Sequence, residues 1–254
     1  AVNNVETLCN APLVLTRGPE WFAALGPEKN GGPKLFCISG QVKRPGVFEA
    51  PMKVSLRELI TDYAGGMRDG HTMKAVIPGG SSVPILLPDQ IDIPASFDDV
   101  QRAGSLLGSA AIMVLDETVD MVWLAENLLH FYRHESCGKC TPCREGTDWL
   151  YKLLHRMLNG EGSTRDITLL KSVADQINGK TLCAFGDAAA TPVLTTLKLF
   201  KHEYEVYARG EKPASKSARA SPSVGTSTWA AESPSSSALR HSAPDGNRTE
   251  ILPR

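Results

Sequence analysis

Residues 135–146 have the sequence ESCGKCTPCREG, which places Cys137, Cys140 and Cys143 at equal spacing in one short segment. A four-iron cluster takes four thiolates, and a C-x2-C-x2-C run lets one tight loop supply three of them. Ferredoxin-type runs continue with a fourth cysteine four residues later, but here that position is Thr147. The fourth ligand is therefore expected from another part of the chain.

Amphipathic helices are predicted on both sides of this loop. Apolar residues recur at helical spacing over 121–132, 149–158 and 167–177, and a last helix is expected over about 188–207 with Asp187 as its cap. The stripe that contains Trp149 and Leu154 is expected in the core. Four helices joined by short loops predict an antiparallel bundle.

The three other cysteines differ in their surroundings. Cys37 lies in a predicted strand, where a free cysteine is expected to be a small buried hydrophobe, and Cys9 lies near the N-terminus with no turn to aim it. Cys183 lies between the third and fourth helices. In an up-and-down bundle that loop opens at the same end as the loop after the first helix, so we predict Cys183 as the fourth ligand.

Zinc is the main alternative to iron. Zinc sites usually combine two separated pairs of ligands, and His130, His134 and His155 are available to complete one. Three evenly spaced cysteines fit that pattern less well than they fit an iron–sulfur cluster. A zinc-stabilised interaction module nevertheless stays open as a function of another class. Disulfides are disfavoured because three neighbouring cysteines leave one unpaired.

The segment before the helices has the pattern of a small α+β unit. Strands are predicted near 34–42, 47–48, 75–77, 83–87 and 112–115, and Ser55 with Glu58 forms a capping box for one helix that Gly65 and Gly66 end. This order predicts a ubiquitin-like or β-grasp fold over residues 33–118. Residues 1–32 are expected to be irregular, and the Ser- and Pro-rich residues 210–254 to be a disordered tail.

Charge and hydropathy exclude several classes of function. The 254 residues contain 27 Lys and Arg against 28 Asp and Glu, so the formal net charge is -1 and no nucleic-acid partner is indicated. The longest nearly apolar run, 105–115, is far shorter than the roughly 20 residues that cross a bilayer. Direct membrane insertion is therefore not expected.

The cysteine motif, together with GKTLCAFGDAAATPV at 179–193, resembles the NADH-binding flavoprotein subunit (the F subunit) of respiratory complex I, NADH:quinone oxidoreductase. LFCISGQVKRPGVFEAPM at 35–52 resembles the SLBB domain of that family, a β-grasp insertion. VNNVETL at 2–8 resembles the end of its flavin-binding domain. The similarity spans about residues 1–210.

The resemblance implies a set of cofactors and ligands. Cys137, Cys140, Cys143 and Cys183 would hold a [4Fe-4S] cluster, in agreement with the bundle argument. Val2, Asn3, Asn4 and Thr7 match the last family positions near FMN, although Asn4 is also explained as a helix cap. No residue is assigned a catalytic role of its own. The glycine-rich NADH and FMN loops of the family precede residue 1, so this chain is not expected to bind NADH unaided.

The resemblance also implies a function in electron transfer. In the family, NADH reduces FMN, and electrons pass singly to the cluster and on towards quinone. The expected partners are a two-iron ferredoxin-like subunit and the large iron–sulfur subunit of the peripheral arm. The expected location is the cytoplasmic side of the bacterial inner membrane, or the matrix side in mitochondria. The diaphorase subunit of an NAD-linked hydrogenase or formate dehydrogenase stays an alternative oxidoreductase.

Overall fold

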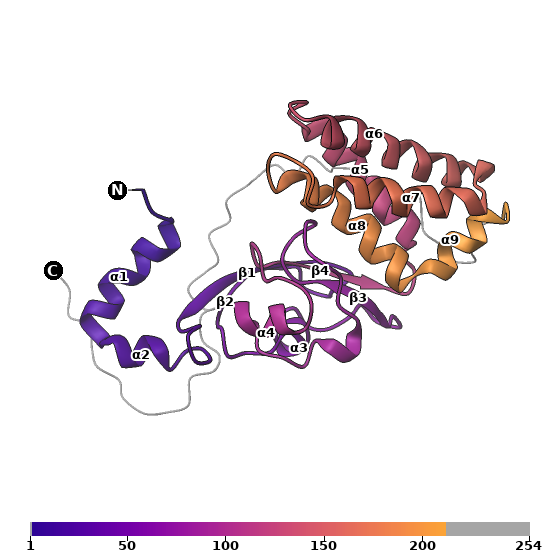
Figure 1. The fold of residues 1–254 in the computed structure, drawn as a ribbon. Helices are drawn as coiled ribbons and strands as arrows, with labels where there is room; N and C mark the ends of the chain where they lie inside the picture. Colours follow the sequence, from indigo (N-terminus) through magenta and orange to yellow (C-terminus); the bar gives the residue numbers. More distant parts are fainter. Residues whose placement is uncertain (1, 212–254) are drawn as a thin grey trace, which may run out of the picture. The chain divides into compact units, whose positions relative to one another are not determined.

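A computed structural model describes residues 2–211 of the protein (Figure 1). In chain order it contains an N-terminal helix pair, a unit built on a four-stranded sheet, and the helices α5–α9. The predicted α+β chain, a β-grasp unit followed by a helical bundle, is confirmed. The predicted tail lies outside the described residues except for Gly210 and Glu211. None of the helices in residues 2–211 is long and apolar enough to span a bilayer.

The N-terminal segment is helical, whereas we expected it to be irregular. It forms α1 (Val5–Arg17) and α2 (Pro19–Ala23). The side chain of Asn4 caps α1 by accepting a hydrogen bond from the backbone N–H of Glu6 at 2.9 Å, which confirms the cap. The carboxylate of Glu6 in turn accepts from the N–H of Leu35 at 2.8 Å and pairs with Lys34 at 3.2 Å. The start of α1 is thereby tied to the first strand.

The β-grasp unit is a mixed sheet with the strand order β2-β1-β4-β3. The strands are β1 (Pro33–Gly40), β2 (Gly46–Pro51), β3 (Met73–Ile77) and β4 (Ala111–Asp116). The central pair β1–β4 is parallel, and both outer pairs are antiparallel. Short helical segments lie between the strands: α3 (Leu56–Glu58), the π-helical turn η1 (Leu59–Tyr63), the 3-10 turn η2 (Pro88–Gln90) and α4 (Phe97–Arg102).

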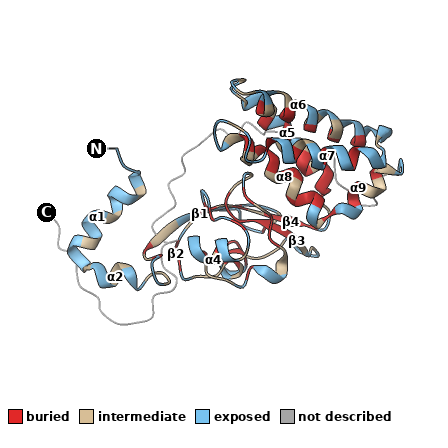
Figure 2. Ribbon diagram, in the orientation of Figure 1, coloured by how far each residue is buried: buried red, intermediate tan, exposed pale blue. Residues whose placement is uncertain are grey.

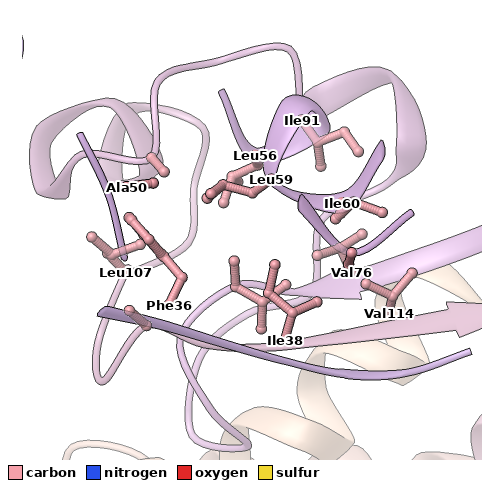
Figure 3. Close-up of a cluster of buried hydrophobic side chains, with 14 of the residues drawn as sticks. Phe36, Ile38, Ala50, Leu56, Leu59, Ile60, Val76, Ile91, Leu107 and Val114 are labelled. Atoms are coloured by element: carbon pink, nitrogen blue, oxygen red, sulfur yellow. The ribbon is translucent and has the colours of Figure 1, made fainter. Parts of the chain in front are cut away.

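The core of this unit forms where α3 and η1 pack on one face of the sheet (Figure 3). Phe36 and Ile38 of β1 are buried against Leu56 and Ile60 from the helical segments. The predicted capping box is present, because Ser55 and Glu58 exchange hydrogen bonds between side chain and backbone at 3.1 and 2.8 Å. Local capping and the buried apolar face thus both place this helix on the sheet.

Two expectations about the β-grasp unit were wrong. Residues 83–87 do not form a strand and make only an isolated bridge between Val76 and Leu86, because Pro84 in their middle has no N–H to donate to a ladder. Cys37 is exposed rather than buried. Alternation explains this result, since Phe36 and Ile38 on either side of it both face the core.

The bundle is formed by α5 (Met121–Glu135), α6 (Thr141–Arg156), α7 (Thr164–Ile177) and α8 (Phe185–Leu199), followed by α9 (Lys201–Ala208). A π-helical turn, η3 (Met157–Glu161), ends α6. Figure 2 shows the buried residues of these helices on the sides that face one another, and they include Leu129, Leu150, Leu170 and Val193. The expectation for Trp149 was wrong, because its side chain is 53% exposed while Leu150 and Leu154 fill the core.

The predicted last helix is divided into two. The helix α8 starts at Phe185, earlier than expected, so Pro192 lies inside it and Asp187 lies in its first turn rather than at its cap. Phe200 leaves helical geometry, with φ −128° and ψ 33°, and separates α8 from α9. Its ring packs with Ala75, Ile77 and Met121. The break therefore serves packing against the β-grasp unit.

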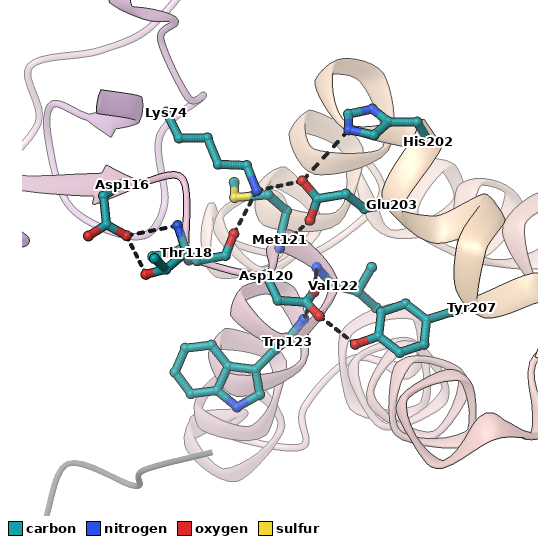
Figure 4. A network of polar contacts seen from close by, with 11 residues as sticks. Lys74, Asp116, Thr118, Asp120, Met121, Val122, Trp123, His202, Glu203 and Tyr207 are labelled. Atoms are coloured by element: carbon teal, nitrogen blue, oxygen red, sulfur yellow. Dashed lines mark hydrogen bonds and ion pairs between the residues drawn. The ribbon is translucent and has the colours of Figure 1, made fainter. Parts of the chain in front are cut away.

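A buried polar network joins the two units at the start of α5 (Figure 4). Asp120 is 2% exposed and caps α5 by accepting from the N–H groups of Val122 and Trp123 at 2.8 and 3.0 Å. Glu203 of α9 accepts from the N–H of Met121 at 2.8 Å and pairs with Lys74 of β3 at 2.5 Å. Tyr207 donates to the other oxygen of Asp120. Two carboxylates therefore hold the first turn of α5.

We predict that Asp120→Ala lowers the free energy of unfolding by about 1–3 kcal/mol, because it removes the helix cap and a buried hydrogen-bond acceptor. Urea unfolding followed by circular dichroism measures the change. Asp120→Asn is the matched control, since asparagine caps helices about as well as aspartate. Equal stability of Asp120→Ala and the parent chain would contradict the role given to this cap.

Candidate metal centre

The cysteine motif lies where the chain passes from α5 to α6. The helix α5 ends at Glu135, and Ser136 adopts an extended conformation at its C-cap. Cys140 is the N-cap residue of α6, with a proline directly inside the helix. Cys143 falls in the first turn. One short connection therefore presents three thiols from a loop, a helix cap and a helix turn.

Backbone and side-chain contacts fix this connection. Gly138 has a φ of +73°, a left-handed conformation that suits glycine. Its carbonyl accepts a hydrogen bond from the guanidinium of Arg144 at 2.9 Å, and the hydroxyl of Thr147 donates to the carbonyl of Cys143 at 2.8 Å. Arg144 therefore closes the loop over the start of α6.

Cys183 lies in the connection between α7 and α8, and this connection is also closed by short-range contacts. The hydroxyl of Thr181 donates to the carbonyl of Cys183 at 2.8 Å, and the N–H of Gly179 donates to Asp187 at 2.5 Å. Gly186 is buried so close to Thr181 that a Cβ atom there would lie 2.4 Å from its side chain. Glycine at position 186 is therefore required for this loop to fold back on itself.

The structure brings the four predicted thiols together. Burial raises the pKa of the Cys143 thiol, the Ser136 hydroxyl opposes that increase, and the charges of Cys140, Cys137 and Cys183 add to it. Cys143 is buried, whereas Cys137 and Cys183 are exposed. Cys143 is thus the most deeply buried of the four thiols, and each of the other three lies close enough to act on its charge.

The other two cysteines take no part in this arrangement. Cys9 is exposed on α1 and Cys37 is exposed on β1. Neither is among the groups whose charges act on Cys143. Cys183 thus stays the predicted partner of the motif.

The spacing of the thiols is wider than a single zinc ion requires. Tetrahedral zinc with Zn–S distances of about 2.3 Å holds its sulfurs only about 3.8 Å apart. Among residues 2–211, the group of three or more ligand atoms that all lie within 4.8 Å of one another is His71, Asp116 and Glu117, with no cysteine in it. No three of the four sulfurs therefore all lie within 4.8 Å of one another, as they would around one zinc ion.

The grouping of His71 with Asp116 and Glu117 is an ion-pair network that sequence analysis missed. The Nδ1 atom of His71 lies 3.0 Å from Asp116 and 3.1 Å from Glu117. Burial alone would raise the pKa of Asp116, but hydrogen bonds from Thr118 and Arg68 outweigh it and lower that pKa. Cationic and hydroxyl partners already satisfy these carboxylates. No sequence pattern links residues so far apart in the chain.

The histidines considered as zinc ligands have other partners. His155 contacts Glu126 at 3.0 Å and stacks on Tyr151, and the ring of His130 lies edge-on to the same tyrosine. His134 contacts Glu135 at 2.8 Å. These contacts lie along the helices, and among the described residues none of the three histidines forms a close group of ligand atoms with the cysteines.

The residues predicted to lie near FMN are at the beginning of α1. Val2, Asn3 and Asn4 are exposed, and Asn4 is occupied as the helix cap. Asn4 and Thr7 line a groove between α1 and the start of β1. The structure thus gathers two of the four positions at one groove.

Comparisons with known proteins identify both structural units. Residues 34–114 match the family described as the SLBB domain, and residues 123–207 match the NADH-ubiquinone oxidoreductase-F iron-sulfur binding region. The chain contains an SLBB domain and an NADH-ubiquinone oxidoreductase-F iron-sulfur binding region. The second region contains all four grouped cysteines, and its description confirms the expectation of an iron–sulfur site in an oxidoreductase family.

Curated relatives agree with this assignment. The chain is 48% identical over 203 residues to the F 2 subunit of NADH-quinone oxidoreductase in Rhizobium meliloti (strain 1021), an alignment that covers 80% of this chain and 48% of the relative. It is 46% identical over 209 residues to the F subunit of the same enzyme in Streptomyces coelicolor, covering 82% and 46%. The chain thus spans about half the length of the curated relatives it matches.

A solved structure supports the fold. The crystal structure of an NAD+-reducing [NiFe]-hydrogenase in the air-oxidised state matches with a TM-score of 0.72 and 33% identity, covering 82% of this chain and 35% of the matched chain. The SLBB domain and the iron–sulfur binding region therefore share their architecture with part of an NAD+-reducing hydrogenase.

One residue of the site was missed although it lies inside the quoted motif. The hydroxyl of Ser136 is 3.3 Å from the sulfur of Cys143. Its backbone position after α5 lets it reach the first turn of α6 across the short loop. The available sequence signal is a hydroxyl residue next to a cysteine in a short loop. The direction in which its side chain points, however, depends on the fold.

We predict that Cys183→Ser loses the cluster or converts it to a three-iron form, because it removes the single ligand outside the motif. Iron and sulfide content with electron paramagnetic resonance (EPR) spectra measures this change. Cys9→Ser and Cys37→Ser are matched controls that should keep the cluster. Loss of iron in Cys37→Ser instead would show that the fourth ligand was assigned wrongly.

Proposed function

We propose that this chain is the iron–sulfur part of the F subunit of an NADH:quinone oxidoreductase. In this proposal, Cys137, Cys140, Cys143 and Cys183 hold a [4Fe-4S] cluster that accepts one electron at a time and passes it on. The observation that carries the proposal is the convergence of Cys183 with the three cysteines of the motif at one end of the bundle, inside the region that matches the iron-sulfur binding family.

The chain's own residues supply what a cluster site needs. Four thiols are present, and metal binding displaces their protons. The burial of Cys143 keeps water from one side, and the hydroxyl of Ser136 is placed to donate a hydrogen bond to its sulfur once that sulfur is a thiolate. These residues bind the group, exclude water and set its electrostatic surroundings.

We extend the proposal to the rest of the protein. NADH and FMN would be held mainly by the part of the relatives' sequences that this chain does not span. Asn3, Asn4 and Thr7 would lie close to the flavin. The chain alone would then not oxidise NADH. Residues 1–32 would end the flavin domain, 33–118 would be the SLBB domain, 119–209 the cluster domain and 210–254 a tail.

The partners follow from the same reasoning. A two-iron ferredoxin-like subunit and the large iron–sulfur subunit of the peripheral arm would exchange electrons with this chain. The protein would lie at the cytoplasmic face of the bacterial inner membrane, or in the mitochondrial matrix. The similarity to an NAD+-reducing hydrogenase favours a diaphorase subunit as the second candidate function.

Anaerobic reconstitution with ferrous iron and sulfide tests the proposal. We expect a brown protein whose reduction by dithionite gives an EPR signal of a reduced four-iron cluster. Purification with one zinc ion per chain and no uptake of iron would instead favour the zinc-stabilised interaction module and contradict the redox function.

The hydrogen bond from Ser136 gives a second prediction. A donor to a ligand sulfur stabilises the more negative, reduced state, so Ser136→Ala should lower the reduction potential. A hydrogen bond of about 0.5–1.5 kcal/mol corresponds to roughly 20–60 mV for one electron. Potentiometric titration monitored by EPR measures this shift.

Ser172→Ala, at an exposed position of α7, is the matched control and should leave the potential unchanged. An unchanged potential in Ser136→Ala would show that this hydroxyl does not act on the cluster.

A further inference from the structure

Tyr132 connects the SLBB domain with the loop that carries Cys183. It lies near the end of α5 and is only 4% exposed. Its hydroxyl lies 2.8 Å from the hydroxyl of Ser81, which follows β3 in the SLBB domain. Its ring packs edge-on to Phe185, with centroids 5.6 Å apart and an angle of 78° between the planes. Phe185 stands two residues after Cys183.

The position of Ser81 in the SLBB domain is fixed because the two glycines before it pack against the backbone of that domain. A Cβ atom on Gly79 would lie 2.4 Å from the carbonyl oxygen of Leu106, so only glycine fits there. The N–H of Gly80 donates to the carbonyl of Ala111 at 2.9 Å. The position of Ser81 is therefore set by the sheet and not by the bundle.

The Cys183 loop has little to hold it from outside. Leu182, Cys183 and Ala184 are all exposed, and the hydrogen bonds described above for this loop join residues within 179–187. Such contacts fix the shape of the loop, while the packing of α7 and α8 in the bundle places its two ends. The ring of Phe185 packs on Tyr132, which belongs to the helix that leads into the cysteine motif.

We propose that Tyr132 is a positioning residue: held by Ser81, it places Phe185 and thereby sets Cys183 against the three cysteines of the motif. This inference rests on the proposed function in that the four thiols hold a cluster. It gives the SLBB domain a part in the geometry of the cluster site. The hydroxyl is needed for this role, because the ring alone would pack on Phe185 without being fixed to the SLBB domain.

Tyr132→Phe and Ser81→Ala test the proposal, since each removes one end of the same hydrogen bond. In the reconstituted chain, each should speed the release of iron to a ferrous chelator by roughly twofold to tenfold, the range that one hydrogen bond spans. Each should also change the EPR line shape of the reduced cluster. The double variant should do no more than either single one.

Tyr204→Phe is a matched control within the same bundle. Tyr204 is fully buried and its hydroxyl lies 2.7 Å from that of Thr196, so its loss removes a comparable hydrogen bond away from the Cys183 loop. It should leave iron release and the EPR line shape unchanged. Equal effects of Tyr204→Phe and Tyr132→Phe would overturn the proposal, because they would indicate a loss of general stability.

A second readout separates this proposal from the proposed function. In the chain without metal, amide hydrogen exchange over 179–187 should be faster in Tyr132→Phe than in the parent chain and unchanged in Tyr204→Phe. Unchanged exchange in Tyr132→Phe would overturn the positioning role, whether or not the chain binds iron. Failure of the parent chain to take up iron and sulfide would instead overturn the proposed function.

Discussion

The first turn of α5 is the constraint on which the arrangement of the site depends. Asp120 caps the helix, and Glu203 accepts a hydrogen bond from the N–H of Met121 at its start. Lys74 of the sheet forms an ion pair with Glu203. Burying carboxylates costs free energy unless each has partners, and here backbone N–H groups and an ammonium supply them. These contacts therefore fix the orientation of α5 relative to the sheet. The other end of α5 leads into Ser136 and the cysteine loop.

The site combines a local part and a long-range part. The three thiols of the motif are grouped by a five-residue connection between α5 and α6, so their closeness is encoded by spacing. Cys183 reaches them only because α7 returns the chain to the same end of the bundle. Close approach of helices makes that return possible: a Cβ on Gly146 of α6 would lie 2.6 Å from Ile177 of α7. The packing of the bundle helices thus also determines where Cys183 lies relative to the motif.

Sequence patterns predicted those features that depend on neighbouring residues. The capping box at Ser55 and the cap at Asn4 required only the spacing of residues along one segment. The absence of a strand over 83–87 has a local cause in Pro84. The break at Phe200 and the exposure of Trp149 depended on which surface each residue meets, and periodicity does not contain that information. The same limit explains why the contacts of Ser81 with Tyr132, and of Lys74 with Glu203, were not predicted.

The electrostatics of the thiols show why the fold tolerates this grouping. Burial raises the pKa of Cys143, the hydroxyl of Ser136 partly offsets the increase, and neighbouring thiolates raise it further. Four thiolates together would repel one another without a compensating positive charge. In the chain without metal, Cys143 therefore stays protonated and behaves as a small apolar side chain in the core. In the proposed function, positively charged iron would replace the protons, so the repulsion that opposes ionisation of the four thiols would become attraction towards the metal.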